Sequence, residues 1–323
     1  MTIVISCGEP AGIGPEVAAK AWDTLRLPML WIGDPRHLPA GTPVAEVAGP
    51  EQAAEVTSRA LPVLPRDFGP PVTPGHPNPA HAQGVIDAIR DGVALIRAGR
   101  ASALCTAPIS KVALVSGAGF AYPGHTEFLA HLGGDVDVVM MLACEGLRVV
   151  PATIHVALSE VPRLLTPERL EGVIRITEAS LRHDWGLTAP RVAVAGLNPH
   201  AGEDGLMGTE ERTVIRPVLD RLRAEGMALS GPHPADTMFH DAARAGYDAA
   251  VCMYHDQALI PIKTVDFARG VNVTAGLPFV RTSPDHGTAF GIAGQGAADP
   301  RSMIAALELA GRLSRRRGTP WRP

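Results

Sequence analysis

The chain alternates between short apolar runs and longer stretches of helical period, a pattern that few folds can accommodate. Each apolar run is short enough for a strand, and each periodic stretch is long enough for a helix. Strands that alternate with helices are joined by right-handed crossovers, which predicts an α/β fold with a mostly parallel sheet and helices on both faces. The expected strands are 2–6, 29–32, 103–106, 138–143, 148–154, 192–195 and 249–253. The expected helices are 14–22, 83–98, 126–132, 167–184, 210–225 and 301–314.

Local turn chemistry adds detail at three places. The run Thr166-Pro167-Glu168 predicts a helix start, with an N-cap, a proline at the first helical position and an acid in the first turn. Thr126 is expected to cap the helix that follows it in the same way. Proline is dense over 61–79, which predicts a surface loop.

Size, charge and cysteine usage exclude several classes of protein. A chain of 323 residues is long enough for two domains or one large domain. Its net charge of -4 gives no reason to expect nucleic acid or an anionic membrane as a partner. No apolar run reaches the roughly 18 residues that a membrane-spanning helix needs, and no signal peptide is evident. The four cysteines lie in or beside apolar runs without a C-x-x-C pair, so we expect buried thiols and a cytoplasmic location.

The segment GEPAGIGPE, residues 8–16, follows the first apolar run and is similar at first sight to a nucleotide-binding loop. A dinucleotide fingerprint needs G-x-G-x-x-G, and a mononucleotide loop needs G-x-x-x-x-G-K-[ST]. The glycines here are Gly8, Gly12 and Gly14, and no Lys-Ser/Thr pair follows, so both patterns fail. The segment alone leaves open whether a phosphate binds here or the chain only turns.

Three histidines, His155, His200 and His255, follow strand-like runs directly or within a few residues. The carboxyl ends of parallel strands meet at one edge of a sheet, where ligands bind. Three neutral imidazoles at that edge are a suitable divalent metal site, with a position left for water or substrate. The competing interpretation is three unrelated histidines at strand ends, and without an H-E-x-x-H motif the sequence does not decide between the two.

Other polar side chains fall on the same expected edge. The motif CTAPISK supplies Lys111, and YPGHTE places His125 and Thr126 at a helix N-terminus, where free N–H groups favour an anion. The alternative interpretation is that His125 is only a turn residue and Thr126 only an N-cap. Arg281 is suited to hold a carboxylate or phosphate through two parallel bonds, or else makes a surface ion pair. Lys263 follows Ile-Pro-Ile, and these apolar neighbours predict more than a solvated charge.

Six motifs together resemble one known family. They are GEPAGIGPE, TAPISK, YPGHTEFLA, GLNPHAGE, YHDQALIPIK and HGTAFGIAG, which occur in this order from about Ile3 to about Leu309. The combination is similar to the 4-hydroxythreonine-4-phosphate dehydrogenases of vitamin B6 (pyridoxine) biosynthesis, which are related to the isocitrate and isopropylmalate dehydrogenases. The resemblance implies their two-domain α/β/α fold, which is not a Rossmann fold, and a homodimer with the active site at the subunit interface.

The metal and substrate patterns of this family fall on residues of the chain. The resemblance implies one divalent ion per site, zinc, magnesium or cobalt, on His155, His200 and His255. It implies that the substrate is contacted by His125, Thr126, Lys263, Asn272 and Arg281. Because the family's site lies between subunits, some of these residues would come from the partner subunit.

The family holds NAD or NADP with a late loop of the form H-G-[ST]-A…A-G-x-G. That pattern falls on His286, Gly287, Thr288, Ala289, Gly294 and Gly296. The N-terminal glycine segment is then not the dinucleotide fingerprint, and its glycines either bring backbone close to the cleft or form a tight turn. Gly291 departs from the family, which usually carries an acid there that holds the ribose and disfavours a 2′-phosphate. We therefore expect weakened discrimination between NAD and NADP.

The resemblance also implies how the domains and the reaction are organised. A discontinuous nucleotide-binding domain is expected over 1–128 and 262–323, with a metal, substrate and dimerisation domain over 129–261. The implied reaction oxidises 4-phosphooxy-L-threonine at its C3 hydroxyl, and the product loses carbon dioxide to give 3-amino-2-oxopropyl phosphate. The candidates for proton acceptor are Lys263, Asp256, Asp236 and Lys111, with Lys263 first because an apolar setting would lower its pKa.

The sequence leaves other functions open. Paralogues with the same metal site oxidise sugar-acid 4-phosphates of the threonate or erythronate type, and others act on a cyclic dihydrodiol dicarboxylate. The stretches GFAYPGHTEFLA and NVTAGLPFVRTSPDHGTAF favour the vitamin B6 branch. A metal hydrolase would leave the HGTA…AGQG loop unexplained, an acyl-phosphate transferase would bind coenzyme A, and a non-catalytic binding protein would not explain so many polar groups at one sheet edge.

Overall fold

The computed structural model describes residues 2–317, which form two compact units. Unit 1 is discontinuous and combines the chain up to Val136 with the part from Leu277 onward, and unit 2 is the segment between them. Both junctions lie further along the chain than the expected divisions at 128 and 261. The reason is that helix α5 (His125–Leu132) belongs to unit 1, whereas helix α10 (His255–Val265) belongs to unit 2.

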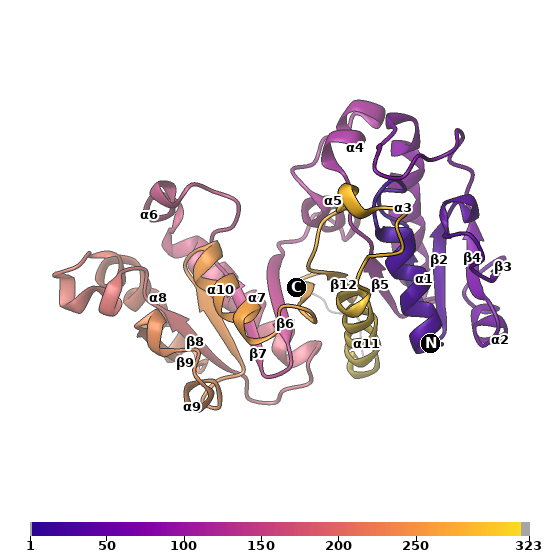
Figure 1. Ribbon diagram of the computed structural model, residues 1–323. Helices are drawn as coiled ribbons and strands as arrows, with labels where there is room; N and C mark the ends of the chain where they lie inside the picture. Colours follow the sequence, from indigo (N-terminus) through magenta and orange to yellow (C-terminus); the bar gives the residue numbers. More distant parts are fainter. Residues whose placement is uncertain (1, 318–323) are drawn as a thin grey trace. The chain divides into compact units, whose positions relative to one another are not determined.

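The strands of unit 1 lie in the order β3-β4-β2-β1-β5-β12, and neighbouring strands pair in parallel (Figure 1). In the register of this sheet, Ile5 lies between Trp31 and Cys105. The strands are β1 (Ile3–Ser6), β2 (Met29–Gly33), β3 (Val44–Glu46), β4 (Leu61–Pro65), β5 (Ala103–Thr106) and β12 (Arg281–Pro284). The helices are α1 (Gly14–Leu25), α2 (Ala53–Val56), α3 (Ala82–Arg97), α4 (Lys111–Ala118), α5 and α11 (Arg301–Arg316).

Two glycines show that helices cover both faces of this sheet. Gly92 of α3 lies so close to the sheet that a Cβ there would be 2.9 Å from Leu104 and 3.2 Å from Val4. Gly311 of α11 lies against Ile3, the neighbour of Val4 in β1. Because successive residues of a strand point to opposite faces, α3 and α11 pack on opposite sides, and the predicted layering of unit 1 is confirmed.

The strands of unit 2 lie in the order β11-β6-β7-β10-β8-β9. Strands β7, β10, β8 and β9 pair in parallel, whereas β6 pairs antiparallel with both β7 and β11. The strands are β6 (Val139–Cys144), β7 (Leu147–Pro151), β8 (Arg191–Ala195), β9 (Ala228–His233), β10 (Ala249–Cys252) and β11 (Val271–Ala275). The helices are α6 (Val161–Leu164), α7 (Pro167–His183), α8 (Arg216–Ala224), α9 (Asp241–Arg244) and α10.

Alternate residues of β10 build the core beneath α10. Ala250 and Cys252 share one buried cluster with Ala258, Leu259 and Ile262 of the helix. Parallel pairing brings the carboxyl ends of β7, β10 and β8 to one edge of unit 2. The segments that carry the three expected metal-binding histidines begin at this edge.

The expectation of a surface loop over 61–79 is wrong for its first part. Residues Leu61–Pro65 form strand β4, which pairs with β2 and β3. Leu61 and Val63 have no exposed surface, so the burial of these side chains outweighs the local preference of the prolines for a turn.

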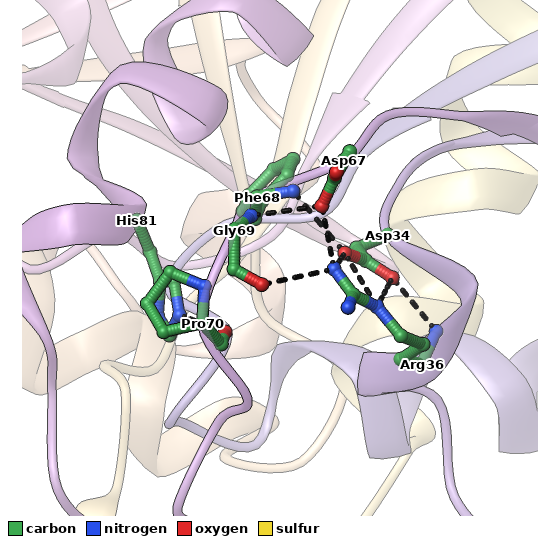
Figure 2. A network of polar contacts seen from close by, with 7 residues as sticks. All are labelled: Asp34, Arg36, Asp67, Phe68, Gly69, Pro70 and His81. Carbon is green, nitrogen blue, oxygen red and sulfur yellow. Dashed lines mark hydrogen bonds and ion pairs between the residues drawn. The ribbon is translucent and has the colours of Figure 1, made fainter.

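A polar network holds the loop that follows β4, as Figure 2 shows. Asp34 lies just beyond β2 and accepts hydrogen bonds from Nε of Arg36 at 2.9 Å and from the amide of Phe68 at 3.2 Å. Nη2 of Arg36 also bonds Asp67 at 2.6 Å and the carbonyl of Gly69 at 3.2 Å. Burial raises the pKa of Asp34, but these donors outweigh it and bring the pKa to about 2.

The two predicted N-caps have different outcomes. The hydroxyl of Thr166 accepts a hydrogen bond from the amide of Arg169 at 3.2 Å, so this cap is confirmed. The prediction for Thr126 is wrong, because α5 already begins at His125 and its N-cap is Gly124, which has no side chain for capping. Thr126 therefore lies in the first turn of the helix.

The helix expected over 210–225 is interrupted. A wider π-type turn occupies Glu211–Ile215, and α8 begins at Arg216. Pro217 has no N–H and cannot continue a regular hydrogen-bond ladder from the preceding turn, which explains the break.

Two further expectations concern the membrane and the thiols. Among residues 2–317, no helix is long and apolar enough to cross a membrane. All four cysteines are free; three are buried and Cys144 is half-buried. Burial raises the pKa of the Cys105 thiol to about 12 and keeps it protonated.

Candidate active site

Two of the three predicted metal ligands lie together in unit 2. His155 follows β7, His255 is the first residue of α10, and their ring centroids are 5.8 Å apart. Both line a cavity of about 310 Å³. The hydroxyl of Thr153 donates a hydrogen bond of 2.8 Å to the carbonyl of Met253, so the two strand ends that carry the histidines are fixed to each other.

His200 does not join this pair within the chain. It is exposed and lies in the tight turn Pro199–Gly205 after β8, where His200 to Asp204 all have left-handed backbone. Among residues 2–317 no three histidine, cysteine or carboxylate side chains gather closely enough to hold a metal. Left-handed backbone in residues other than glycine is strained, and such strain concentrates at functional sites.

A buried carboxylate holds the His200 turn in place. Glu211, with 3% of its surface exposed, accepts hydrogen bonds from the amide of Asn198 at 2.7 Å and from its side chain at 3.0 Å. The side chain of Gln257 accepts from the amide of Met253 at 2.6 Å and donates to the carbonyl of Gly196 at 2.8 Å.

Gln257 therefore connects the segments that carry His255 and His200. No sequence motif identifies Gln257 or Glu211 as part of a site. The only sequence signal for Gln257 was its place in YHDQALIPIK, two residues after the histidine.

The candidate proton acceptors of unit 2 have unequal surroundings. Asp256 is exposed and bonds Nδ1 of His255 at 2.7 Å, whereas Asp236 is exposed in the turn Ala235–Thr237. Lys263 is half-buried on α10, with its ammonium 5.3 Å from the centre of the Phe267 ring. The apolar neighbours of Lys263 in the sequence differ, because Ile262 is buried whereas Ile260 is 64% exposed.

Asn272 lies on β11 opposite Leu142 and is half-buried. Its side-chain oxygen is enclosed and has no hydrogen-bond partner among residues 2–317. A buried amide oxygen without a partner costs free energy, so it is well suited to accept a hydrogen bond from a ligand.

Unit 1 contributes a buried cation. Arg281 begins β12 with 4% of its surface exposed, and its Nε and Nη2 donate to the hydroxyl of Thr106 at 3.2 and 2.6 Å. Burial lowers the pKa of Arg281 to about 10, which leaves the guanidinium charged at neutral pH. A desolvated guanidinium attracts an anion more strongly than an exposed one does.

The first turn of α5 carries His125 and Thr126, and both are half-buried. Burial and the charge of Arg281 lower the pKa of His125 well below its ordinary value, so its ring is neutral. Nε2 of His125 is enclosed and has no partner among residues 2–317. Lys111, the other unit 1 candidate, is the exposed first residue of α4.

The expected cofactor loop is mostly exposed in unit 1. Ala289, Gly294 and Gly296 have left-handed backbone with φ of 46°, 74° and 70°. A Cβ at Gly287 or Gly296 would meet nothing within 4 Å, so a ligand has room to approach the backbone there. Nδ1 of His286, the first residue of the motif, bonds the carbonyl of Gly287 at 3.0 Å.

The chain matches a family model described as pyridoxal phosphate biosynthetic protein PdxA over residues 26–310. The chain belongs to this family. A relative from Ruegeria sp. (strain TM1040), named 4-hydroxythreonine-4-phosphate dehydrogenase, is 62% identical over 317 residues, which cover 98% of this chain and 97% of the relative. The resemblance drawn from the six motifs is thereby confirmed.

Solved structures confirm the predicted α/β fold class of this PdxA family member. The crystal structure of 4-hydroxythreonine-4-phosphate dehydrogenase from Klebsiella pneumoniae is 38% identical, with a TM-score of 0.88 over 97% of this chain and 99% of that one. A branched-chain phosphotransacylase from Enterococcus faecalis V583 is 14% identical with a TM-score of 0.56, covering 98% of this chain and 99% of that one. The second likeness concerns the fold alone.

Proposed function

We propose that this chain is a metal-dependent, NAD(P)-linked 4-hydroxythreonine-4-phosphate dehydrogenase that acts in pyridoxal phosphate biosynthesis. A hydride leaves C3 of 4-phosphooxy-L-threonine for the nicotinamide, and the hydroxyl proton goes to a base. The product, 2-amino-3-oxo-4-phosphooxybutanoate, is a β-keto acid that loses carbon dioxide to give 3-amino-2-oxopropyl phosphate. The observation that carries the proposal is the 62% identity to a relative of that name.

The edge of unit 2 suits a divalent metal ion, because two imidazoles line one small cavity there. We propose His155 and His255 as two ligands and His200 as the third. The bond from Asp256 to Nδ1 of His255 leaves Nε2 of that ring for the metal and fixes the ring orientation. When bound, a divalent ion would stabilise negative charge on the C3 oxygen.

We propose that the protein is a homodimer and that His200 completes the metal site of the partner subunit. Two apolar side chains directly after the His200 turn support this proposal. Leu206 is 84% exposed and Met207 is 43% exposed, and a partner surface would cover them. An isologous interface would then give two equal sites, each with histidines from both subunits.

The carboxylate and the phosphate of the substrate need cationic groups and hydrogen-bond donors to bind them. We propose Arg281 as the main anion-binding residue, because its charge is buried and its fork suits a carboxylate or phosphate. The neutral ring of His125 and the first-turn N–H groups near Thr126 add donors. Asn272 and Lys263 are the contacts proposed from unit 2.

We propose that the loop from His286 to Gly296 holds the nicotinamide dinucleotide. Its exposed glycine backbone gives a pyrophosphate or ribose close access, and Nε2 of His286 is enclosed without a partner among residues 2–317. Both NAD and NADP are proposed as cofactors, because this loop carries Gly291 at the position where the family resemblance implies an acid.

Lys263 is proposed first as the proton acceptor. Asp256 already bonds a proposed metal ligand, which favours an orienting role for this carboxylate. Asp236 and Lys111 are both exposed and are the less favoured candidates.

The absorbance of reduced nicotinamide tests the proposal directly. Purified protein would be incubated with 4-phosphooxy-L-threonine and either NAD or NADP, with a divalent metal or with a chelator. Reduced cofactor that forms only with metal supports the proposed reaction. Turnover of a sugar-acid 4-phosphate in place of this substrate would move the protein to a paralogous function, and no turnover of either would contradict the dehydrogenase proposal.

A further inference from the structure

The N-terminal glycine segment packs against the proposed cofactor loop. The amide of Ile13 donates to the carbonyl of Thr288 at 3.0 Å. At Gly12 a Cβ would lie 2.8 Å from that carbonyl oxygen, so only glycine allows this close approach. The glycine segment 8–16 therefore supports the proposed cofactor loop, although the two are far apart in the sequence.

One ammonium group extends this support to the end of the loop. Nζ of Lys20, on α1, donates to the carbonyl of Gly296 at 2.7 Å, to the carbonyl of Ala298 at 2.7 Å and to Oε1 of Glu16 at 2.8 Å. The same oxygen of Glu16 accepts a hydrogen bond from the amide of Ala298 at 2.9 Å. An ammonium has three N–H donors, and here each has an acceptor.

Partial burial of Glu16 and Lys20 strengthens the bonds that they make. Glu16 has 7% of its side-chain surface exposed, so its ion pair with Lys20 is shielded from water on one side. Charge-assisted bonds of this kind are stronger than bonds between neutral groups. They hold a stretch, 294–297, that is otherwise exposed.

We propose that Lys20 and Glu16 are positioning residues that fix the cofactor loop in its dinucleotide-binding conformation. The proposal rests on the function proposed above for the loop. A loop held before binding loses less conformational entropy when the ligand arrives, so its affinity is higher. Neither residue is among the proposed metal, substrate or proton-accepting residues, so we expect the effect of the pair to fall on dinucleotide binding rather than on turnover.

Three variants test this role. K20M removes the donors and the charge while keeping an apolar stem, and E16Q removes the charge of the acceptor. We expect K20M to raise KM for the dinucleotide about ten-fold, with kcat and KM for the phosphorylated substrate within about two-fold of the wild type. K20R keeps a charged hydrogen-bond donor, so its KM for the dinucleotide should be close to that of the wild type.

The matched control is R26M. Arg26 caps the other end of α1 and bonds the carbonyl of Asp23, so this change removes a cation from the same helix without touching the loop. R26M should leave KM for the dinucleotide unchanged. An equal rise in KM for K20M and R26M would show a general effect on α1 and would overturn the proposal.

Hydrogen exchange separates the positioning role from the cofactor assignment. In the wild-type protein the dinucleotide should slow exchange in the peptide that covers 286–298, and K20M without ligand should exchange faster there. A wild-type protein whose peptide is not protected by the dinucleotide would contradict the cofactor assignment, and the positioning role with it. Protection in the wild type together with unchanged exchange and KM in K20M would overturn the positioning role alone.

Discussion

The hydroxyl oxygen of Thr106 accepts hydrogen bonds from both Nε and Nη2 of Arg281. Thr106 ends β5 and Arg281 begins β12, and the two strands are neighbours in the sheet of unit 1. This small side chain therefore helps to orient a buried guanidinium. If this group binds the substrate anion, its affinity depends on Thr106 as well as on the charge.

We expect T106V to raise KM for the phosphorylated substrate about ten-fold, because valine has the same shape but leaves two buried donors without this acceptor. R281A removes the cation and should raise KM by roughly a hundred-fold or more. Steady-state kinetics at saturating dinucleotide measure both effects. T106S keeps the hydroxyl and is the control; an unchanged KM in R281A would assign the arginine to structure.

The histidine arrangement predicts complementation between subunits. H155A and H200A should each abolish metal binding and nearly all turnover while the far-UV circular dichroism stays native. If His200 serves the partner's site, a mixed dimer of the two variants has one intact site. Unfolding and refolding an equal mixture should then recover about one quarter of the wild-type activity, because half of the dimers are mixed.

A matched pair of variants controls this experiment. H155A and H255A alter two histidines that lie together in one chain, so their mixture should recover no activity. Metal content, measured on the same samples, should follow activity. If H155A and H200A also fail to complement each other, the proposed sharing of the site is wrong.

The sequence predicted the elements whose apolar pattern is local. Helices such as α3 and α11 and buried strands such as β1 and β5 were predicted within one or two residues, because one buried face repeats at regular spacing. Two elements with internal prolines were missed. Leu61–Pro65 forms a strand and α10 passes through Pro261, because packing against the core outweighs the local cost of proline.

The candidate site was predictable only as far as strand ends determine it. His155 lies beside His255 because β7 and β10 are neighbouring parallel strands, although β8 and β9 come between them in the sequence, so the order along the chain does not predict this pairing. The bond between Ile13 and Thr288 joins segments far apart in the sequence, and no local pattern predicts it. The exposed position of His200 depends on a left-handed turn that the sequence GLNPHAGE does not specify by periodicity.

A buried histidine predicts how stability depends on pH. The ring of His37 lies 5.2 Å from that of Phe68 and 5.4 Å from that of His81. Burial lowers the pKa of His37 from 6.5 to about 4; Asp34 opposes this shift, and the charges of His81 and Arg36 add to it. Between these values the unfolded chain binds a proton that the folded chain does not, so the free energy of unfolding falls as the pH falls.

We expect the free energy of unfolding of H37F to fall less at low pH than that of the wild type, because phenylalanine keeps the ring contacts and does not titrate. Between pH 7 and pH 4.5 the loss attributable to His37 is on the order of 2 kcal/mol. Urea unfolding at both pH values measures it. H76N changes an exposed histidine of the same region and should keep the wild-type dependence; an H37F protein that loses as much stability as the wild type would contradict the prediction.

Gly291 offers the sharpest test of cofactor choice. It lies in the exposed turn Phe290–Ile292, and a Cβ there would meet no atom within 4 Å, so G291D fits without moving the loop. A carboxylate at this position can accept from the ribose hydroxyls of NAD and repels the 2′-phosphate of NADP. We expect the wild-type protein to use both cofactors, and G291D to raise the ratio of kcat/KM for NAD over NADP about ten-fold or more. G291N adds a side chain without charge and should shift the ratio far less, because repulsion of the phosphate requires the carboxylate. Exclusive use of NAD by the wild-type protein would contradict this prediction and would mean that another group excludes the 2′-phosphate of NADP.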